Sequence, residues 1–420
     1  MDFNLDNFIA KHVTEREESM FLQDMEAHRE ELTQAVKGKS VLVIGGAGSI
    51  GSSFIRALLP YEPATLVVAD TNENGLAELT RDIRSRGLFV PEDYVPYPMD
   101  YSSGVFEKMF RARGGFSIVA NFSAHKHVRS EKDIYSVEAL FTNNVLCAKK
   151  FLDLLTDYPP GSYFCVSTDK AANPVNLMGA SKRIMEDLIF SYSDQFPVKT
   201  ARFANVAFSN GSLPDGFLHR LSRQQPLTAP TDVRRFFVSP EESGQICFMA
   251  CVLGKNREIF FPKLREDQTK RFDEIATALL KEYGYEPLLC NSDAEAVAKM
   301  KELAADATGD QTFAHDAAGD HASGDKGYPV HYFTSDTSGE KPYEEFYVEG
   351  EALDMERFSS LGVITDKDAP PREQVTALTD RMKQLFQQEG LQKEDLVEAI
   401  AAYLPNFAHI ETGKGLDQRM

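Results

Sequence analysis

The stretch Val41-Leu-Val-Ile-Gly45-Gly46-Ala47-Gly48-Ser49-Ile50-Gly51 combines a short apolar run, a cluster of glycines and the start of an amphipathic segment. This order is typical of a buried strand that turns tightly into a helix. Gly45 permits the tight turn, Gly48 lets the backbone approach a pyrophosphate, and Gly51 lets the helix pack closely on the strand. The stretch therefore predicts a dinucleotide-binding turn.

Two neighbouring features extend this prediction. The helix opens with Ser49 and Ile50, where backbone N–H groups and the positive helix end are expected to hold the pyrophosphate. The next strand, 65–69, ends in Asp70, at the interval expected for a carboxylate that accepts from the adenosine ribose. NAD is favoured over NADP because this carboxylate repels a 2′-phosphate and no arginine directly follows it. Asp100 ends a further strand-like run, where it either accepts from the adenine amino group or caps the local backbone.

The order of apolar and amphipathic stretches from residue 40 to residue 205 predicts the fold class. Short apolar runs alternate with amphipathic stretches of helical length. The apolar runs are 41–44, 65–69, 116–120 and 163–166, and the helical stretches are 49–59, 76–85, 136–155 and 177–192. Alternation of this kind predicts an α/β fold of the Rossmann type, with a doubly wound parallel sheet.

The rest of the chain divides by composition. We expect an N-terminal helical extension at 1–39, an NAD-binding Rossmann domain at 40–205 and a smaller C-terminal substrate-binding lobe at 206–365, where the alternation loosens. Within the lobe, 307–327 is rich in Asp, Gly, Ala and His and predicts a mobile insertion. Two amphipathic stretches predict a helical tail at 366–420.

Charge and cysteine content exclude several classes of protein. The 45 basic and 64 acidic residues give a formal charge of −19, which disfavours nucleic acid and membrane as partners and leaves any anionic ligand to local donors. The five cysteines, an odd number in apolar segments, predict core residues and not a disulfide framework. The start lacks a signal-peptide pattern and no apolar run approaches about 18 residues, so we expect a cytoplasmic protein. The cluster His315, Asp316, Asp320 and His321 lies in a glycine-rich stretch and predicts a solvated loop, so no metal is expected.

A second group of polar residues follows the apolar run 163–166. Thr168, Asp169 and Lys170 come directly after its end, and a predicted helix just beyond opens with Met178 and Lys182. Met178 and Lys182 are four residues apart, which places both on one face of that helix. The pattern predicts a catalytic centre at the carboxyl edge of the sheet; a surface turn is the alternative.

Together these motifs resemble the extended short-chain dehydrogenase/reductases. Within them, the chain is most similar to the nucleotide-sugar 4,6-dehydratases of the polysaccharide biosynthesis type, which act on UDP-N-acetylglucosamine. The resemblance runs from about residue 40 to residue 350. Besides the glycine turn, it rests on Ala124-His-Lys-His-Val128, Asn144-Val145, Ser167-Thr-Asp-Lys-Ala-Ala-Asn-Pro174, Met178-Gly-Ala-Ser-Lys182, Arg202-Phe-Ala-Asn-Val206, Asp232-Val-Arg-Arg-Phe236 and Gly339-Glu-Lys-Pro-Tyr-Glu-Glu345.

The resemblance implies a reaction. NAD⁺ takes hydride from sugar C4, the resulting ketone acidifies the C5 proton, water leaves from C6, and hydride returns to C6. Lys170 matches the family's base at C5 and Asp169 matches the acid that protonates the C6 hydroxyl. Such a base must be a neutral amine, with its pKa lowered by burial or by a cation such as Lys182, and the acid must be a protonated carboxyl.

Further roles are implied residue by residue. Thr168 matches a hydrogen-bond partner of the C4 oxygen, and Lys182 matches a lysine that holds the nicotinamide ribose. Asn144 matches a helix asparagine that orders a water near that lysine. Lys126 matches a residue that lines the cofactor and substrate cleft; a solvated lysine is the alternative.

Met178 is a departure from most short-chain dehydrogenases, which have tyrosine there. Methionine has no ionisable proton and cannot take the proton of the C4 hydroxyl. The larger dehydratases of the family show the same replacement, so Met178 supports membership of that subfamily. Two candidates for the missing base stay open, namely Asp169 and a water relayed from Lys182.

For the substrate, Asn205 and Arg235 match residues that face the diphosphate, and Arg235 can bind it through two hydrogen bonds. The family usually has arginine where this chain has Thr337, which leaves UDP and GDP sugars both open. The alternatives to a dehydratase are a nucleotide-sugar epimerase and a non-catalytic dinucleotide sensor. By analogy with short-chain dehydrogenases, which pair through helices flanking the sheet, we expect a homo-oligomer.

Overall fold

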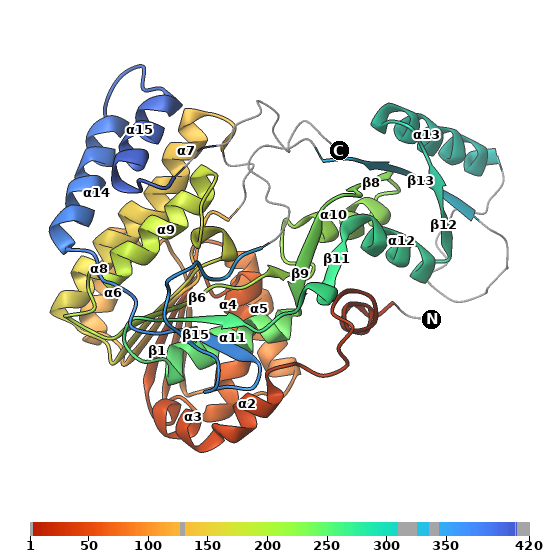
Figure 1. The fold of residues 1–420 in the computed structure, drawn as a ribbon. Helices are drawn as coiled ribbons and strands as arrows, with labels where there is room; N and C mark the ends of the chain where they lie inside the picture. The colour runs from red at the N-terminus through yellow and green to blue at the C-terminus, as the bar shows by residue number, and fades with distance from the viewer. Residues whose placement is uncertain (1–2, 127–130, 310–325, 336–343, 408, 410–420) are drawn as a thin grey trace.

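The computed structural model describes residues 3–126, 131–309, 326–335, 344–407 and 409 (Figure 1). Its large sheet consists of β1 (Ser40–Ile44), β2 (Thr65–Asp70), β3 (Asp93–Pro98), β4 (Ile118–Asn121), β5 (Ser162–Val166), β6 (Val198–Ala201), β10 (Glu258–Pro262), β14 (Leu353–Asp354) and β15 (Leu361–Ile364). Among the described residues these nine strands lie in the order β14-β15-β10-β6-β5-β4-β1-β2-β3. The strands from β3 to β10 are parallel, and β15 and β14 add an antiparallel edge. The predicted doubly wound α/β sheet is confirmed.

The strand order reverses at β1, which has β2 on one side and β4 on the other. Connections from these strands therefore leave in opposite directions and open a crevice at their carboxyl ends, the place where α/β sheets bind ligands. β5, whose end carries Thr168, Asp169 and Lys170, lies directly beside β4. The predicted cofactor turn and the predicted catalytic residues consequently share one edge of the sheet.

Helices cover both faces of this sheet because side chains alternate along each strand. In β1, Val41 and Val43 face one hydrophobic cluster, and Leu42 and Ile44 face the other. The first face is covered by α3 (Arg29–Val36), α4 (Ser49–Leu58), α5 (Glu73–Ser85) and α11 (Pro240–Leu253). The second is covered by α6 (Gly104–Arg113), α7 (Ile134–Phe141), α8 (Ala148–Asp157) and α9 (Leu177–Phe190), with the tail helices α14 (Arg372–Phe386) and α15 (Lys393–Tyr403) beside them.

The long helical stretch predicted at 136–155 is interrupted. A π-helical segment, η4 (Thr142–Cys147), separates α7 from α8. Such segments insert an extra residue into a helix and often occur at functional sites. This one carries Asn144, whose side chain is buried.

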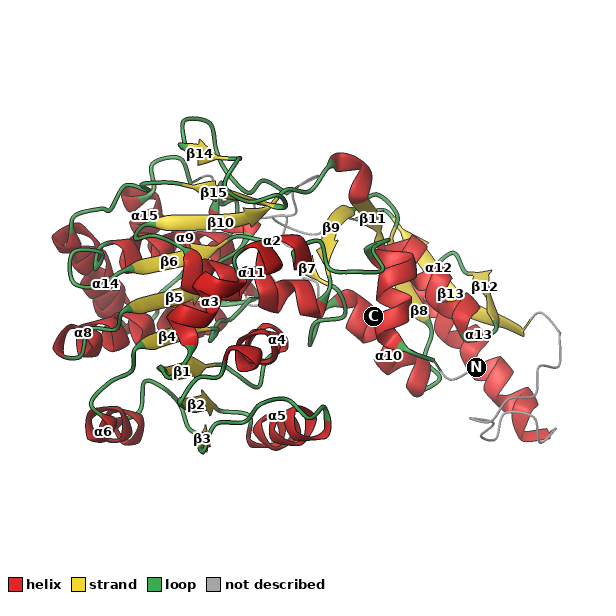
Figure 2. Ribbon diagram, turned by 90° about the horizontal axis from the view of Figure 1, so that it is seen from below, coloured by secondary structure: helices red, strands yellow, loops and turns green. Residues whose placement is uncertain are grey.

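A smaller lobe lies beyond one end of the large sheet (Figure 2). It is built from β7 (Asn205–Val206), β8 (Leu227–Pro230), β9 (Arg234–Val238), β11 (Thr269–Arg271), β12 (Tyr285–Leu289), β13 (Lys326–Phe333), α10 (Leu213–Ser222), α12 (Phe272–Glu282) and α13 (Asp293–Gly309). In the described part of the chain its strands form two three-stranded sheets, β11-β9-β7 and β12-β13-β8. β10, β14 and β15 also come from residues 206–365 but belong to the large sheet, and α11 covers one of its faces, so the lobe is not one continuous stretch of chain.

The N-terminal residues contact both parts of the molecule. They form α1 (Leu5–Phe8), the π-helical η1 (Ile9–Val13), α2 (Leu22–Ala27) and α3. Phe8, Ile9 and Val13 pack into the hydrophobic cluster of the lobe, whereas Phe21, Leu32 and Val36 pack under the large sheet and Leu22 is exposed. Between them, Arg16 donates to both carboxylate oxygens of Glu242 on α11, from Nε at 2.7 Å and from Nη2 at 2.6 Å.

The predictions on the cysteines, on membrane-spanning segments and on the insertion can also be compared with the structure. The five cysteines, all in the described part of the chain, are free thiols; Cys147 is partly buried and the other four are buried. Within the described residues, no helix combines the length and the apolar character needed to span a bilayer. Most of the predicted insertion 307–327, with His315, Asp316, Asp320 and His321, lies outside the described residues.

Candidate functional site

The glycine-rich turn after β1 depends on two of its glycines. Gly45 has a φ of +73°, and a Cβ there would lie 2.8 Å from the backbone of Phe122 and Ser123. A Cβ on Gly51 would lie 2.3 Å from the carbonyl oxygen of Gly45. Gly48 is the N-cap residue of α4 and has no side chain with which to cap it. The first-turn N–H groups of α4 are therefore suited to an anionic group, as a dinucleotide pyrophosphate requires.

The start of α4 is also in contact with the lobe. Ser49, the first residue of α4, accepts a hydrogen bond on Oγ from the backbone N of Asn210 at 3.0 Å, and Ile50 follows it in the helix. On the other side of the same loop, Ser209 accepts from Lys126 Nζ at 3.3 Å. The lobe loop that follows β7 is thus joined both to the glycine turn and to the loop after β4.

Asp70 ends β2, and its carboxylate is hydrogen-bonded to the glycine turn. Oδ2 accepts from Ala47 N at 2.9 Å, and Oδ1 accepts from Asn72 N at 2.9 Å. A carboxylate oxygen can accept two hydrogen bonds, so both keep capacity for a hydroxyl such as that of a ribose. Asp100 is different: it is exposed, and Oδ1 accepts from Ser102 N at 2.7 Å, the local capping contact that was the alternative to adenine recognition.

Thr168, Asp169 and Lys170 form a connected set at the carboxyl end of β5. Thr168 Oγ1 donates to Asp169 Oδ1 at 2.6 Å, and Lys170 Nζ lies 3.2 and 3.1 Å from the two oxygens of Asp169. Asp169 is buried, whereas 29% of the Lys170 side chain is exposed. Because the carboxyl and the amine are in direct hydrogen-bond contact, a proton can pass between them without an intermediary.

α9 carries Lys182, which contacts the end of β5 close to Thr168, Asp169 and Lys170. Lys182 is buried, and its Nζ donates to the carbonyl oxygen of Val166, the last residue of β5, at 2.8 Å. Burial lowers the pKa of Lys182, and the nearby Cys165 and Glu186 only partly offset this effect. Met178 lies one turn earlier on α9 and is buried with 2% of its surface exposed.

Asn144 braces the loop after β4. Its Oδ1 accepts from His125 N at 2.8 Å and from Asn143 Nδ2 at 3.0 Å. Its Nδ2 donates to His125 O at 2.9 Å and to Ser181 Oγ, on α9, at 3.0 Å. An amide side chain has two donors and two acceptor lone pairs, and all four are used here. Asn144 thus joins the loop after β4 directly to α9, and the ordered water that the family resemblance implies stays a prediction.

The lobe contributes Asn205 from β7 and Arg235 from β9, together with Glu344. Arg235 is buried, and its Nη1 donates to the carbonyl oxygen of Arg234 at 2.8 Å. Glu344 is buried as well: Oε2 accepts from the backbone N of Phe236 at 2.7 Å, and Oε1 accepts from Asn205 Nδ2. Burial and the neighbouring charge of Asp169 raise the pKa of Glu344 to about 7, against the opposing effect of Lys170 and Arg235.

Glu344 was not predicted as a site residue, although it lies in the segment 339–345 that carries part of the family resemblance. The signal for it was its place in that segment. No local pattern pairs it with Asp169, because the two come from distant parts of the chain. The structure brings Asp169, Lys170 and Arg235 within electrostatic range of Glu344.

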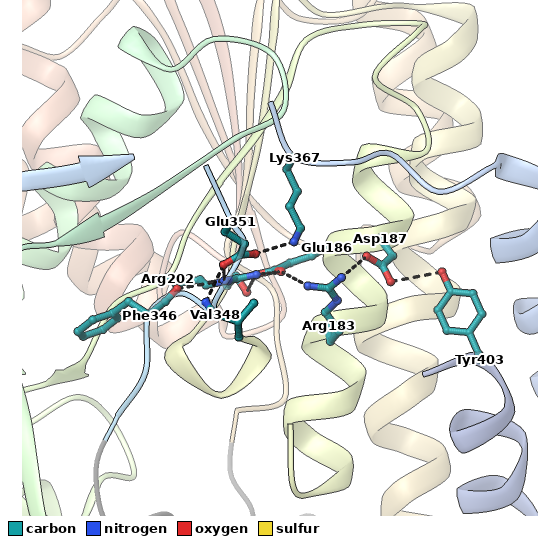
Figure 3. A network of polar contacts seen from close by, with 10 residues as sticks. Arg183, Glu186, Asp187, Arg202, Phe346, Val348, Glu351, Lys367 and Tyr403 are labelled. Atoms are coloured by element: carbon teal, nitrogen blue, oxygen red, sulfur yellow. Dashed lines mark hydrogen bonds and ion pairs between the residues drawn. The ribbon is translucent and has the colours of Figure 1, made fainter. Parts of the chain in front are cut away.

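A largely buried ionic network connects elements that carry the candidate site residues (Figure 3). Arg202, at the end of β6, pairs with Glu186 on α9 and with Glu351, and its Nη1 donates to Phe346 O at 3.0 Å. The network extends to the tail: Lys367 reaches Glu351, and Tyr403 of α15 donates to Asp187 of α9 at 3.4 Å. It joins the helix that carries Lys182 to the chain segment that carries Glu344. Within the described residues, no group of three or more His, Cys, Asp or Glu side chains is arranged to hold a metal ion.

Comparison with known proteins identifies relatives for this architecture. A family model described as "Polysaccharide biosynthesis protein" matches residues 41–301, more than half of the chain. An uncharacterized membrane protein of Methanocaldococcus jannaschii is 30% identical over 265 residues, which cover 61% of this chain and 77% of that protein. A Campylobacter jejuni protein named UDP-N-acetylglucosamine 4,6-dehydratase (inverting) is 27% identical over 54% of this chain and 67% of its own length.

Other relatives are much longer than the matched region. The probable polysaccharide biosynthesis protein EpsC of Bacillus subtilis is 27% identical over 61% of this chain, and the match spans only 42% of EpsC. Among solved structures, Pen from Bacillus thuringiensis superimposes with a TM-score of 0.59 over 83% of this chain and 98% of its own, at 19% identity. That likeness shows a shared fold.

Proposed function

The chain belongs to the polysaccharide biosynthesis protein family, and from this premise we propose that it is an NAD-dependent nucleotide-sugar 4,6-dehydratase. Its proposed substrate is UDP-N-acetylglucosamine, and the product is the 4-keto-6-deoxy sugar nucleotide. The family contains sugar-nucleotide dehydratases of the short-chain dehydrogenase type, and the Campylobacter relative carries this substrate in its name.

The observation that carries the proposal is the contact between Asp169 and Lys170 at the end of β5. Elimination of water across C5 and C6 needs a base for the C5 proton and an acid for the C6 hydroxyl on one side of the sugar. Adjacent residues that share a hydrogen bond can supply both groups to neighbouring carbons. We assign Lys170 as the base and Asp169 as the acid.

The residues at the crevice fit a dinucleotide cofactor. The tight glycine turn, the α4 N-terminus and the Asp70 carboxylate are the donor and acceptor set that NAD requires, and we assign Gly45, Gly48, Ser49, Ile50, Gly51 and Asp70 to it. When bound, the nicotinamide supplies reversible hydride transfer, from sugar C4 and back to sugar C6.

The remaining assignments follow from position. Thr168, beside Asp169, is the proposed hydrogen-bond partner of the C4 oxygen. Lys182, buried behind β5, is the proposed partner of the nicotinamide ribose. Arg235 and Asn205 lie on the lobe side, where the diphosphate of the substrate is proposed to lie, and Lys126, which donates to Ser209, is proposed to line the cofactor and substrate cleft.

The test is incubation of the purified protein with UDP-N-acetylglucosamine, followed by mass spectrometry of the sugar nucleotide. A product lighter than the sugar nucleotide by one water supports dehydratase activity. An isomer of unchanged mass would identify an epimerase, for which the Asp169–Lys170 pair has less use. Turnover of a GDP sugar, and not of the UDP sugar, would reassign the nucleotide; Thr337, on which that choice depends, lies outside the described residues.

A further inference from the structure

The N-terminal segment 14–20 crosses from the lobe to the large sheet. Val13, just before it, is buried in the hydrophobic cluster of the lobe, and Phe21, just after it, is buried under the large sheet. Figure 1 shows the start of the chain beside α12 of the lobe, and α2 and α3 beneath the large sheet. Both ends of the segment are therefore anchored, each in a different part of the molecule.

Arg16 lies within this segment and contacts both parts. Its Nε and Nη2 donate to the two carboxylate oxygens of Glu242, on α11, at 2.7 and 2.6 Å. Nη2 also donates to the carbonyl oxygen of Phe237, on β9 of the lobe, at 3.0 Å. A guanidinium is planar and its donors have fixed directions. These contacts therefore fix the orientation of β9 relative to α11 as well as the distance between them.

The β9 contact lies next to the proposed diphosphate ligands. Phe237 follows Arg235 by two residues on β9, and it is the register partner of Asn205 on β7. On the other edge of β9, Lys270 of β11 is the register partner of Arg235, and Lys270 forms an ion pair with Glu15 of the segment. The segment thus holds the lobe sheet at positions that adjoin or pair with both ligands.

The α11 contact leads to the cofactor turn. α11 packs on α4 so closely that a Cβ on Gly244 would lie 2.2 Å from the carbonyl oxygen of Ser53. Gly244 follows Glu242 by two residues, and Ser53 lies one turn after Ser49, the first residue of α4. Close-packed helices transmit displacements with little loss. The position of Glu242 is therefore tied to that of the glycine turn.

The proposed reaction places one substrate across these two parts. The diphosphate lies on the lobe, whereas the sugar has to reach a nicotinamide that is held at the glycine turn. If β9 is already fixed relative to the large sheet, the diphosphate binds without an ordering cost. If the substrate itself has to order β9, that cost is subtracted from its affinity.

We propose that Arg16 is a positioning residue for the diphosphate of the nucleotide sugar. By joining Glu242 to the backbone of Phe237, it holds β9 and the paired β7 relative to the large sheet. In this arrangement Arg235 and Asn205 are in place before the substrate arrives. The inference rests on the proposed function, and it gives the N-terminal segment a part in substrate affinity and none in the chemical step.

The test compares Arg16→Met with a matched control, Arg357→Met. Arg357 likewise donates to both carboxylate oxygens of a buried glutamate, Glu258, at 2.9 and 2.8 Å, and to a backbone carbonyl oxygen, that of Leu253. Exposed fractions are similar in the two pairs, 13% and 1% for Arg16 and Glu242, 19% and 5% for Arg357 and Glu258. The control pair lies within the large sheet and contacts α11 at the end opposite to Glu242.

The measurements separate substrate affinity from stability and chemistry. We expect Arg16→Met to raise KM for UDP-N-acetylglucosamine, and to weaken UDP binding in calorimetry, by about tenfold, as for loss of one hydrogen bond to a charged group. Its kcat should stay within about threefold, because the ordering cost falls equally on bound substrate and transition state, and NAD affinity should not change. Arg357→Met should lower the free energy of unfolding in urea by a similar amount and leave KM and UDP affinity unchanged.

Arg16→Lys is the second variant, and it decides the matter if Arg16→Met does not fold. It keeps the positive charge beside Glu242, but an ammonium lacks the planar fork, so we expect a folded protein with a smaller rise in KM. Unchanged KM and UDP affinity in the folded Arg16 variants, or an equal rise in KM in Arg357→Met, overturns the inference. So does a loss of NAD affinity as large as that of UDP affinity. Failure of the wild-type protein to release water from any nucleotide sugar would instead overturn the proposed function.

Discussion

The guanidinium of Arg202 donates to both carboxylate oxygens of Glu186, from Nε at 2.8 Å and from Nη2 at 2.7 Å, and neither side chain is exposed. Glu186 lies one turn after Lys182 on α9, and its Oε1 also accepts from Ser167 Oγ at 2.6 Å. Burial alone would raise the pKa of Glu186, but the adjacent Arg202, together with Arg183 and Ser167, holds that pKa below its usual range. The pair fixes the helix that carries Lys182 against the ends of β5 and β6.

Breaking this pair should destabilise the protein strongly. Arg202→Met leaves Glu186 charged and buried without its main partner, which typically costs about 3–5 kcal/mol, measurable by urea denaturation at neutral pH. Arg81→Met is the matched control: it removes an exposed pair with Glu78 and should cost less than about 1 kcal/mol. Equal costs for the two variants would show that the buried pair contributes no more than a surface contact.

The same pair gives a pH dependence with a defined sign. Because the pKa of Glu186 is depressed in the folded protein, its contribution is complete above the unfolded value of about 4.3 and is lost as the pH falls through the folded value. Wild-type stability should therefore decline below about pH 4.3 more steeply than that of Arg202→Met. Parallel declines in a urea series from pH 6 to pH 3 would contradict this.

Lys170→Ala should abolish water loss and leave cofactor binding intact. The amine contacts Asp169 and no residue of the glycine turn in the contacts described above, so its removal eliminates the C5 base alone. We expect a loss of kcat of at least about 10²-fold. NAD affinity, measured by calorimetry, is expected to be unchanged. Retention of dehydratase activity would show that another group takes the C5 proton.

Met178→Leu should be tolerated. The side chain is buried and supplies no proton, and leucine is close to it in volume, so the expected stability change is below about 1.5 kcal/mol. We expect kcat to stay within about threefold of wild type, since only packing changes. A folded Met178→Leu protein that has lost activity would assign the thioether a direct contact with the substrate or cofactor.

Asp70→Ala and Asp100→Ala should distinguish the two carboxylates that the sequence offered as cofactor ligands. Asp70 is hydrogen-bonded to the glycine turn, so its loss should weaken NAD binding by about 10-fold to 100-fold, as for a hydrogen bond to a charged group. Asp100 is exposed and bonds its own loop, so we expect little change in NAD affinity. Comparable losses in calorimetry would indicate that Asp100 does reach the adenine.

The large sheet could be predicted because its signals are local. Buried parallel strands are short apolar runs, and the turn between β1 and α4 needs glycine at Gly45 and Gly51 for steric reasons that any sequence must obey. The positions of Thr168, Asp169 and Lys170 followed from the same logic, because residues after a buried strand emerge at the carboxyl edge of the sheet.

The short strands of the lobe and the role of Glu344 could not be predicted in this way. β7 has two residues and β11 three, too few for a periodic pattern, and β9 begins with two arginines. Glu344 bonds Asn205 across 139 residues of sequence, a contact that no local rule specifies. The interruption of the predicted helix 136–155 at η4 contains no glycine or proline that would have signalled it, and Asn144 within it makes four hydrogen bonds to other parts of the chain and to its neighbour.

The network around Arg202 has a consequence for the order in which the protein is made. Arg202 bonds Glu351 across 149 residues, and Asp187 of α9 bonds Tyr403 across 216. Chains are synthesised from the N-terminus, so α9 leaves the ribosome well before Glu351, Lys367 and Tyr403 exist. During that interval a buried arginine lacks one of its two carboxylates. The ionic contacts beside the candidate site can therefore be completed only after residues up to Tyr403 have been synthesised, however early the strands before them have folded.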